Sequence, residues 1–222
     1  MSNILLSDLI YIKENCISND QCDKIIEEYE SRIEHAEQEI AYNPVNDRLE
    51  PSTFQRIELI PNSVNFNIVH KATNEMIDEW INYLNTFKSF STRQLKEVLR
   101  FSHLHRVLKY SEGQSIHAHT DFDETIHASC TICLNDHYEG GDFVFWNGRY
   151  KLDLKKGDAA IWPADPFWVH EVLPVTKGSR YSTNTFIQTV NLADSRNIWN
   201  IIDDMTNRSL YNPYIYPNWN KI

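Results

Sequence analysis

The sequence lacks any long hydrophobic run and contains little cysteine. No apolar stretch approaches the roughly 18 residues that a membrane-spanning helix needs. Four cysteines in 222 residues are too few for a disulfide framework and indicate a reducing compartment. The first residues, 1–12, are interrupted by Asp8, and no basic segment precedes them, so they do not look like a signal peptide. These absences predict a cytoplasmic protein without a membrane partner.

Basic residues are also scarce. The chain has 21 Lys and Arg against 31 Asp and Glu, which gives a net charge of −10. A nucleic-acid-binding surface needs clustered Lys and Arg, so we expect no nucleic-acid partner. The hydrophobic content of 41% excludes a disordered chain. The length favours a single domain over residues 1–222 and leaves the oligomeric state open.

Glycine is absent from the first half of the chain. All six glycines lie between Gly113 and Gly178. Because glycine marks turns and positive-φ positions, we expect a β-rich core over about 101–190. Helical patterns before it predict an N-terminal helical support over about 1–100. A helical pattern and then an aromatic, proline-rich segment predict a C-terminal helix and tail over about 191–222.

Two helices are expected in the N-terminal part. Ser18 and Gln21 have the spacing of a capping box, and an apolar stripe follows them at helical spacing. A second helix is expected after Thr73. Residues 43–67 carry three prolines and are predicted to form a loop, with one strand around 54–60.

Short alternating runs predict the strands of the core. Asn147-Gly148 between two of them indicates a hairpin with a type I′ turn. Many short strands with frequent turns are typical of a sandwich or jelly roll, so the fold class is α+β, mainly β. The expected strands are 103–110, 115–119, 128–134, 143–146, 149–154, 159–162 and 181–190.

One histidine and one aspartate in the core have metal-ligand spacing. His119 and Asp121 lie two residues apart, so on a strand they point to the same side. With His170 they would complete a 2-His-1-carboxylate triad, which leaves positions open on Fe(II). A His-x-Asp motif alone is too short to decide, and isolated histidines are usually structural.

A basic residue after the third candidate ligand favours a catalytic metal site over isolated structural histidines. Arg180 opens an alternating strand, and its planar guanidinium matches a carboxylate. Beside an iron site, such an arginine suits the distal carboxylate of 2-oxoglutarate. A surface salt bridge is the alternative for this residue taken alone. The order of the four residues favours the catalytic interpretation.

These motifs together resemble a known family. Their order is similar to that of the 2-oxoglutarate- and Fe(II)-dependent oxygenases, in particular the prolyl 4-hydroxylase-like branch, over about residues 100–190. The resemblance implies a double-stranded β-helix, a cupin-like jelly roll with N-terminal buttressing helices. The motifs that carry it are Tyr110, His119-Thr120-Asp121, Gly140-Gly141, Pro163, His170 and Gly178-Ser179-Arg180.

The resemblance also implies roles. It implies Fe(II) and 2-oxoglutarate, with O2 as the other cosubstrate and ascorbate as an optional reductant. The iron ligands would be His119, Asp121 and His170, which are catalytic together with Arg180. The residues implied at the cosubstrate are Arg180, Tyr110, Thr131 and Asn184. Some relatives have a tyrosine where this chain has Cys133.

The resulting hypothesis is a dioxygenase that hydroxylates a C–H bond and releases succinate and CO2. The resemblance favours a prolyl residue in a peptide or protein as the target. A cupin-like metalloenzyme that does not use 2-oxoglutarate, with His117 as a ligand, is one alternative, and a non-catalytic binding module is the other.

A few further side chains near the expected site have two readings. Cys130 and Cys133 are expected to be buried apolar residues rather than a redox pair, because they point to opposite faces of a strand. Arg106 either enters the cleft or forms an exposed salt bridge. The aromatic residues Phe143, Trp162 and Phe186 either line the site or pack in the core.

Overall fold

The computed structural model describes residues 3–43, 46, 48–122 and 125–191. The chain up to Thr189 forms one compact unit; of a second unit, Val190–Ile222, only Val190 and Asn191 are described. The predicted C-terminal helix and aromatic tail therefore lie outside the described residues.

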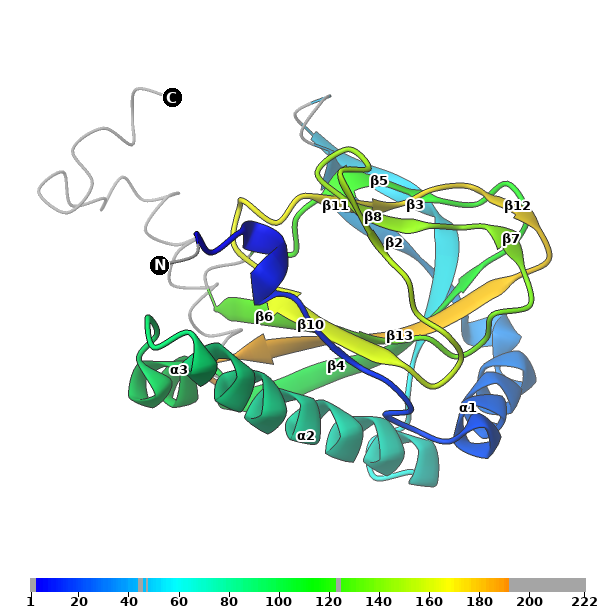
Figure 1. The fold of residues 1–222 in the computed structure, drawn as a ribbon. Coiled ribbons are helices and arrows are strands. Elements are labelled where there is room, and N and C mark those ends of the chain that lie inside the picture. Colours follow the sequence, from blue (N-terminus) through cyan, green and yellow to red (C-terminus); the bar gives the residue numbers. More distant parts are fainter. Residues whose placement is uncertain (1–2, 44–45, 47, 123–124, 192–222) are drawn as a thin grey trace, which may run out of the picture. The chain divides into compact units, whose positions relative to one another are not determined.

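Two antiparallel sheets stacked on each other dominate the compact unit (Figure 1). Every strand pair in them is antiparallel. The major sheet has the order β1 (Tyr11–Lys13), β10 (Ala159–Pro163), β6 (Ile126–Ile132), β13 (Arg180–Gln188), β4 (Phe101–Tyr110), β3 (Arg48–Glu58) and β2 (Glu37–Asn43). The minor sheet has the order β5 (Ile116–His119), β11 (His170–Val172), β8 (Phe143–Phe145) and β9 (Tyr150–Leu152). A short pair, β12 (Val175–Lys177) with β7 (Glu139–Gly140), completes the double-stranded β-helix. The expected fold is confirmed.

Three α-helices accompany the sheets, and the long one lies along the outer face of the major sheet (Figure 1). They are α1 (Asn19–Ser31), α2 (Val64–Thr86) and α3 (Thr92–Val98), with 3-10 turns at Leu6–Leu9 and Ile33–His35. Trp80 and Met76 of α2 are buried in one core with Ile161 and Ile187 of the sheet. The other face of the sheet packs on the minor sheet through Trp162 and its neighbours. The alternation of side chains along each strand thus supplies both a helix-facing core and an inner face that is free to build a site.

The first helix begins where the sequence predicts. Ser18 accepts a hydrogen bond from the Gln21 backbone N–H, while the Gln21 side chain accepts from the Ser18 N–H. The predicted start of the second helix is wrong, because α2 begins at Val64 with Ser63 as its N-cap. Asparagines in its first turns weaken the helical signal there.

The expectation for residues 43–67 is right in part. The strand expected around 54–60 is present, but it begins earlier, as β3 (Arg48–Glu58), and pairs with β2 in a long hairpin that extends the major sheet beside β4, where a loop was expected. The Asn147-Gly148 hairpin is confirmed: both residues have positive φ, as a type I′ turn requires, and Phe145 pairs with Tyr150. No helix in the described ranges is long and apolar enough to cross a membrane.

Candidate active site

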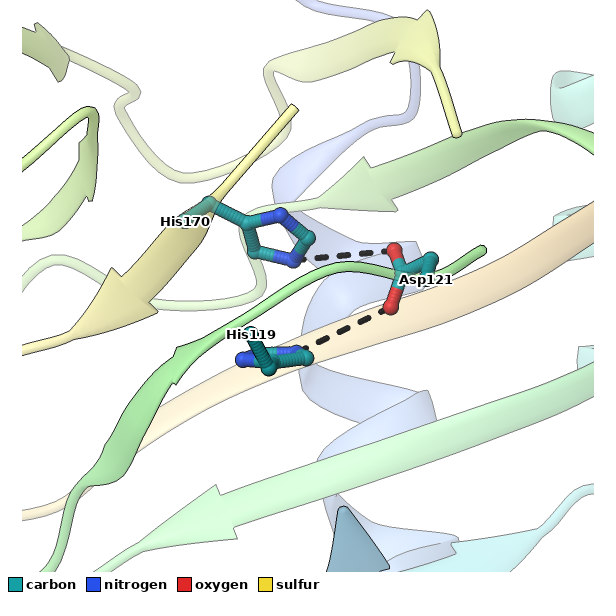
Figure 2. A group of neighbouring side chains, drawn as sticks. All are labelled: His119, Asp121 and His170. Atoms are coloured by element: carbon teal, nitrogen blue, oxygen red, sulfur yellow. Dashed lines mark ion pairs between the residues drawn. The ribbon is translucent and has the colours of Figure 1, made fainter. Parts of the chain in front are cut away.

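The three predicted metal ligands meet at one end of the minor sheet. His119 ends β5 and His170 begins β11, and the antiparallel pairing of these strands places the two residues directly opposite each other. Asp121 follows two residues after His119. One ligand atom from each of the three lies within 4.8 Å of the others. Figure 2 shows the Asp121 carboxylate facing both imidazoles, with one oxygen toward each ring.

Backbone carbonyls fix the protonation of both histidines. His119 Nδ1 lies 2.8 Å from the carbonyl oxygen of His117, and His170 Nδ1 lies 2.9 Å from that of Trp168. Because a carbonyl oxygen only accepts, each Nδ1 must carry the proton. In a neutral ring the lone pair is then on Nε2. Both Nε2 atoms face Asp121, at 3.7 Å and 3.6 Å, which is too long for a hydrogen bond.

Burial keeps the His119 ring neutral. Desolvation, and then the neighbouring His170, lower the pKa of His119 to about 4. Burial alone would raise the pKa of Asp121, but the neighbouring His170 and His119, the Ser129 hydroxyl and the charge of Arg106 lower it overall, so the carboxylate is ionised. Two imidazole lone pairs and a carboxylate therefore converge on one point, and Asp121 Oδ2 has no hydrogen-bond partner among the described residues. This donor set fits a divalent cation such as Fe(II), with open positions beside the three ligands.

A cavity of about 300 Å³ opens over the three ligands. Its inner wall comes from strands of both sheets, including Tyr110 and Asn184 of the major sheet and Phe143 of the minor sheet. The β2–β3 hairpin supplies the outer wall. The site therefore lies between the two sheets, at the open end of the β-helix, which is a common place for a small-molecule site.

Arg180 lies in an adjoining cavity, also about 300 Å³, which shares Phe143 with the first. The side chain is buried, at 4% exposure. One terminal nitrogen donates to the Ser182 hydroxyl at 2.8 Å, and the guanidinium carbon lies 5.3 Å from the Tyr110 ring centre. Within the described part of the chain, Arg180 Nε has no hydrogen-bond partner. A buried cation with free donors fits a carboxylate ligand.

The other residues expected to contact 2-oxoglutarate are Tyr110, Asn184 and Thr131, and their surroundings differ. Tyr110 is buried between the candidate metal site and Arg180, and burial raises the pKa of its phenol. Asn184 lines the cavity over the ligands, but its side-chain oxygen accepts from Arg106. Thr131 belongs to the lining of neither cavity, and its hydroxyl donates to the Thr183 carbonyl at 2.7 Å. Its role at the cosubstrate stays a prediction.

The burial and cavity positions of several side chains decide between the alternatives that the sequence left open. Arg106 is not an exposed salt bridge; it is 7% exposed and lines the cavity. Phe143 and Phe186 line the cavity too, whereas Trp162 packs in the core against His170. The cysteines Cys130 and Cys133 are free, buried thiols, as expected.

One residue of the cavity wall could not be expected from the sequence. Glu39 contacts Arg106 from β2, a strand that the sequence patterns did not reveal. No local motif marks it.

Comparison with known proteins relates the core of the chain to one enzyme superfamily. Residues 105–188 match the family model of the 2OG-Fe(II) oxygenase superfamily. This segment contains all three candidate ligands and Arg180. This part of the chain is therefore similar to the 2OG-Fe(II) oxygenase superfamily, in agreement with the resemblance seen in the sequence.

Within the superfamily, the chain is similar to hydroxylases. A PKHD-type hydroxylase of Cupriavidus pinatubonensis is 30% identical over 113 residues, which are 45% of this chain and 48% of the relative. One of Acinetobacter baylyi is 30% identical over 114 residues, 49% of this chain and 46% of the relative. The matched segments span less than half of these relatives.

Solved structures share the fold at low identity. A Pseudomonas putida prolyl-4-hydroxylase has a TM-score of 0.61 and 16% identity, covering 84% of this chain and 97% of that one. A Trichoplax adhaerens prolyl hydroxylase, in complex with a hypoxia inducible factor peptide fragment, has a TM-score of 0.62 and 13% identity, covering 86% and 87%. These similarities confirm the double-stranded β-helix.

Proposed function

We propose that this chain is a 2-oxoglutarate- and Fe(II)-dependent dioxygenase that hydroxylates a C–H bond of its substrate. The observation that carries the proposal is the convergence of the two unprotonated Nε2 atoms on the Asp121 carboxylate. Without a cation, these groups present only lone pairs and negative charge to one another in a buried place. A divalent metal removes that cost.

Different residues of the candidate site would bind the metal and the cosubstrate. His119, Asp121 and His170 would hold the iron on one face. Bound iron and 2-oxoglutarate supply the oxidation of the C–H bond, with succinate and CO2 as the products from the cosubstrate. Arg180 would bind the distal carboxylate of 2-oxoglutarate, supported by Ser182 and Tyr110.

A prolyl residue in a peptide or protein is the proposed target. The support comes from the prolyl hydroxylases among the structural neighbours, one of them in complex with a peptide. The rim of the cavity also suits a peptide, because Ile40, Leu49 and Phe122 are 62%, 69% and 53% exposed there. Exposed apolar side chains grouped at a cavity mouth are typical of a docking surface.

A reducing, cytoplasmic location belongs to the proposal as well. All four cysteines are free, and two of them, Cys130 and Cys22, are fully buried. In both, burial raises the pKa of the thiol, which makes it a poor nucleophile. A role of these cysteines in disulfide chemistry therefore has no support.

The test is turnover of 2-oxoglutarate by the purified protein. With Fe(II) and ascorbate, we expect succinate even without a substrate, because such oxygenases consume 2-oxoglutarate slowly when uncoupled. His170→Ala should abolish both metal binding and succinate. Arg180→Leu should keep metal binding but raise the KM for 2-oxoglutarate by more than about 100-fold, the loss expected for a buried charged hydrogen bond.

The same variants separate the alternatives. A cupin-like metalloenzyme would bind iron and be indifferent to 2-oxoglutarate and to Arg180→Leu. A non-catalytic module would bind neither iron nor 2-oxoglutarate in calorimetry. Lys155→Leu is a matched control, since Lys155 lies at the rim of the Arg180 cavity and is exposed. It should leave the KM for 2-oxoglutarate unchanged.

A further inference from the structure

A second buried arginine lies in the wall of the candidate active site. Arg106 is 7% exposed and lines the same cavity as His119, Asp121 and His170. It is distinct from Arg180, which belongs to the adjoining cavity. Its guanidinium carbon lies 4.6 Å from the ring centre of Phe186, so the ring supports one face of the guanidinium group.

The protein uses only part of the hydrogen-bonding capacity of Arg106. A guanidinium has five N–H donors in a planar fork. One terminal nitrogen donates to Glu39 and the other to the side-chain oxygen of Asn184. Nε, although buried, has no partner among the described residues. Donors are thus left over on a cation that faces the cavity.

Glu39 does not fully satisfy this cation. It reaches Arg106 through Oε2 alone, and the Nε of Arg56 lies 2.9 Å from the same oxygen. One carboxylate oxygen therefore serves two arginines. The other partners of Arg56 are the exposed Glu37 and Glu58, which solvent screens. The bidentate pairing that makes an arginine–carboxylate contact strong is missing at Arg106.

A purely structural role does not explain well why Arg106 is buried in the cavity wall. Linking β2, β4 and β13 by a buried charge costs desolvation, and an apolar side chain of similar size would serve at least as well. A charge that faces a cavity beside the reaction centre is better explained by the ligand that enters. That ligand must offer an anionic acceptor.

We propose that Arg106 binds a carboxylate of the substrate and so selects substrates that carry an acidic group close to the oxidised carbon. This inference rests on the proposed function and specifies the substrate of that same site. The carboxylate is an aspartate or glutamate side chain beside the target residue in a peptide, or the α-carboxylate of a free amino acid. Both sources share the chemistry that Arg106 recognises.

The test compares acids with their neutral amides. The probes are acetyl-Asp-Pro-amide against acetyl-Asn-Pro-amide, acetyl-Pro-Asp-amide against acetyl-Pro-Asn-amide, and L-proline against L-prolinamide. Each is titrated by calorimetry into protein loaded with Mn(II) and 2-oxoglutarate. We expect the acid of at least one pair to bind ten times more tightly than its amide. The peptide pairs and the free amino acid pair distinguish the two sources.

Two variants give opposite results if the inference is correct. Arg106→Gln should bring the acid-to-amide ratio close to one. Glu39→Gln should increase the ratio, because it removes the anion that competes for the guanidinium. An increase is not expected from a variant that merely loosens the wall, so the second variant keeps the test valid even where Arg106→Gln is poorly folded.

Two results would overturn the inference. One is the absence of any acid preference in the wild-type protein, and the other is a preference that persists in Arg106→Gln. If that variant also raises the KM for 2-oxoglutarate, Arg106 would belong to the cosubstrate instead. Succinate formation by the wild type is measured in parallel. If it fails, the proposed function itself is wrong; if succinate forms without acid preference, only the role of Arg106 is.

Discussion

The ring of Phe143 lies flat against the imidazole of His170, with 5.1 Å between the ring centres and 10° between the planes. Phe143 also lines both the cavity over the metal ligands and the cavity of Arg180. One aromatic side chain therefore packs on a candidate metal ligand and lies between two cavities.

Replacing this ring should loosen the metal site. We expect Phe143→Leu to weaken Mn(II) binding about tenfold, since losing a partner that orients a ligand typically costs 10–100-fold in affinity. Calorimetry measures the change. Phe186→Leu is the matched control, because Phe186 lines the same cavity and stacks on Arg106 instead. Equal losses in both variants would show that packing in general, rather than the orientation of His170, sets the affinity.

Asp121 should link the stability of the protein to metal binding. Asp121→Asn replaces the carboxylate that would bind the cation by an amide of similar size, so the part of the stability that depends on metal should be lost. Added Mn(II) should raise the Tm of the wild type and leave that of the variant unchanged. Thermal melts with and without Mn(II) measure both effects. Asp20→Asn, an exposed replacement on α1, should behave as the wild type; an Asp121→Asn variant that Mn(II) still stabilises would contradict Asp121 as a ligand.

Alanine substitutions at two adjacent glycines should have different effects, one on cosubstrate binding and the other on stability. A Cβ on Gly141, which has φ +64°, would lie 3.2 Å from Arg180 Cδ and 2.9 Å from Val175 Cγ2. Gly141→Ala should therefore displace Arg180 and raise the KM for 2-oxoglutarate at least tenfold. A Cβ on Gly140 would instead lie 2.5 Å from the Pro174 carbonyl oxygen. Gly140→Ala should destabilise the protein by about 1–3 kcal/mol without a specific effect on that KM.

If both variants changed the KM equally, strain in the glycine turn rather than the position of Arg180 would be responsible. Denaturant unfolding beside the kinetic assay distinguishes the two cases.

A histidine outside the active site should make stability depend on pH. His105 is 2% exposed, and its ring nitrogens lie 3.1 Å from His70 and 3.0 Å from the Thr185 hydroxyl. Burial, and then the neighbouring His70 and His103, lower the pKa of His105 to about 3. The unfolded chain binds this proton near pH 6.5, so the stabilisation is fully present above pH 6.5 and is lost as the pH falls toward 3.

The expected slope is about 1.4 kcal/mol of unfolding free energy per pH unit below pH 6.5. Urea unfolding at pH 7.0, 6.0 and 5.0 measures it in the wild type and in His105→Gln, whose curve should lack this component. His35→Gln replaces an exposed histidine and should keep the wild-type slope. A His105→Gln slope equal to that of the wild type would assign the acid sensitivity to other groups.

The sequence predicted the fold best where strands alternate. The strands of the major sheet have one face toward the helices and one toward the site, so their period of two is visible. The seven expected core strands lie within three residues of the observed bounds, whereas the short strands β7, β11 and β12 were not expected. Strand β2 was missed, and β3 was expected only around 54–60, because prolines and charges interrupt the alternation of this hairpin. The start of α2 was missed because its capping serine precedes polar turns.

The site was predictable in its local motif and less so in its walls. His119 and Asp121 share a short motif, and the order of His170 and Arg180 after it carries the resemblance. The burial of Arg106 depends on Glu39, a residue of the missed hairpin. The hydroxyl of Thr131 is used by the neighbouring strand, a contact that only the pairing of β6 with β13 determines. Such contacts between distant segments leave no trace in one sequence.

The pairing of His119 with His170 joins two segments about fifty residues apart, and closing a loop of that length costs the unfolded chain conformational entropy. A metal held across this pair would act as a reversible cross-link between β5 and β11. Its loss should open the minor sheet locally before the rest of the protein unfolds. Amide hydrogens of β5 and β11 should then exchange faster without metal, while those of β4 and β13, buried under the helices, keep their protection. Besides its proposed role in catalysis, a bound metal would therefore hold two strands of the β-helix together.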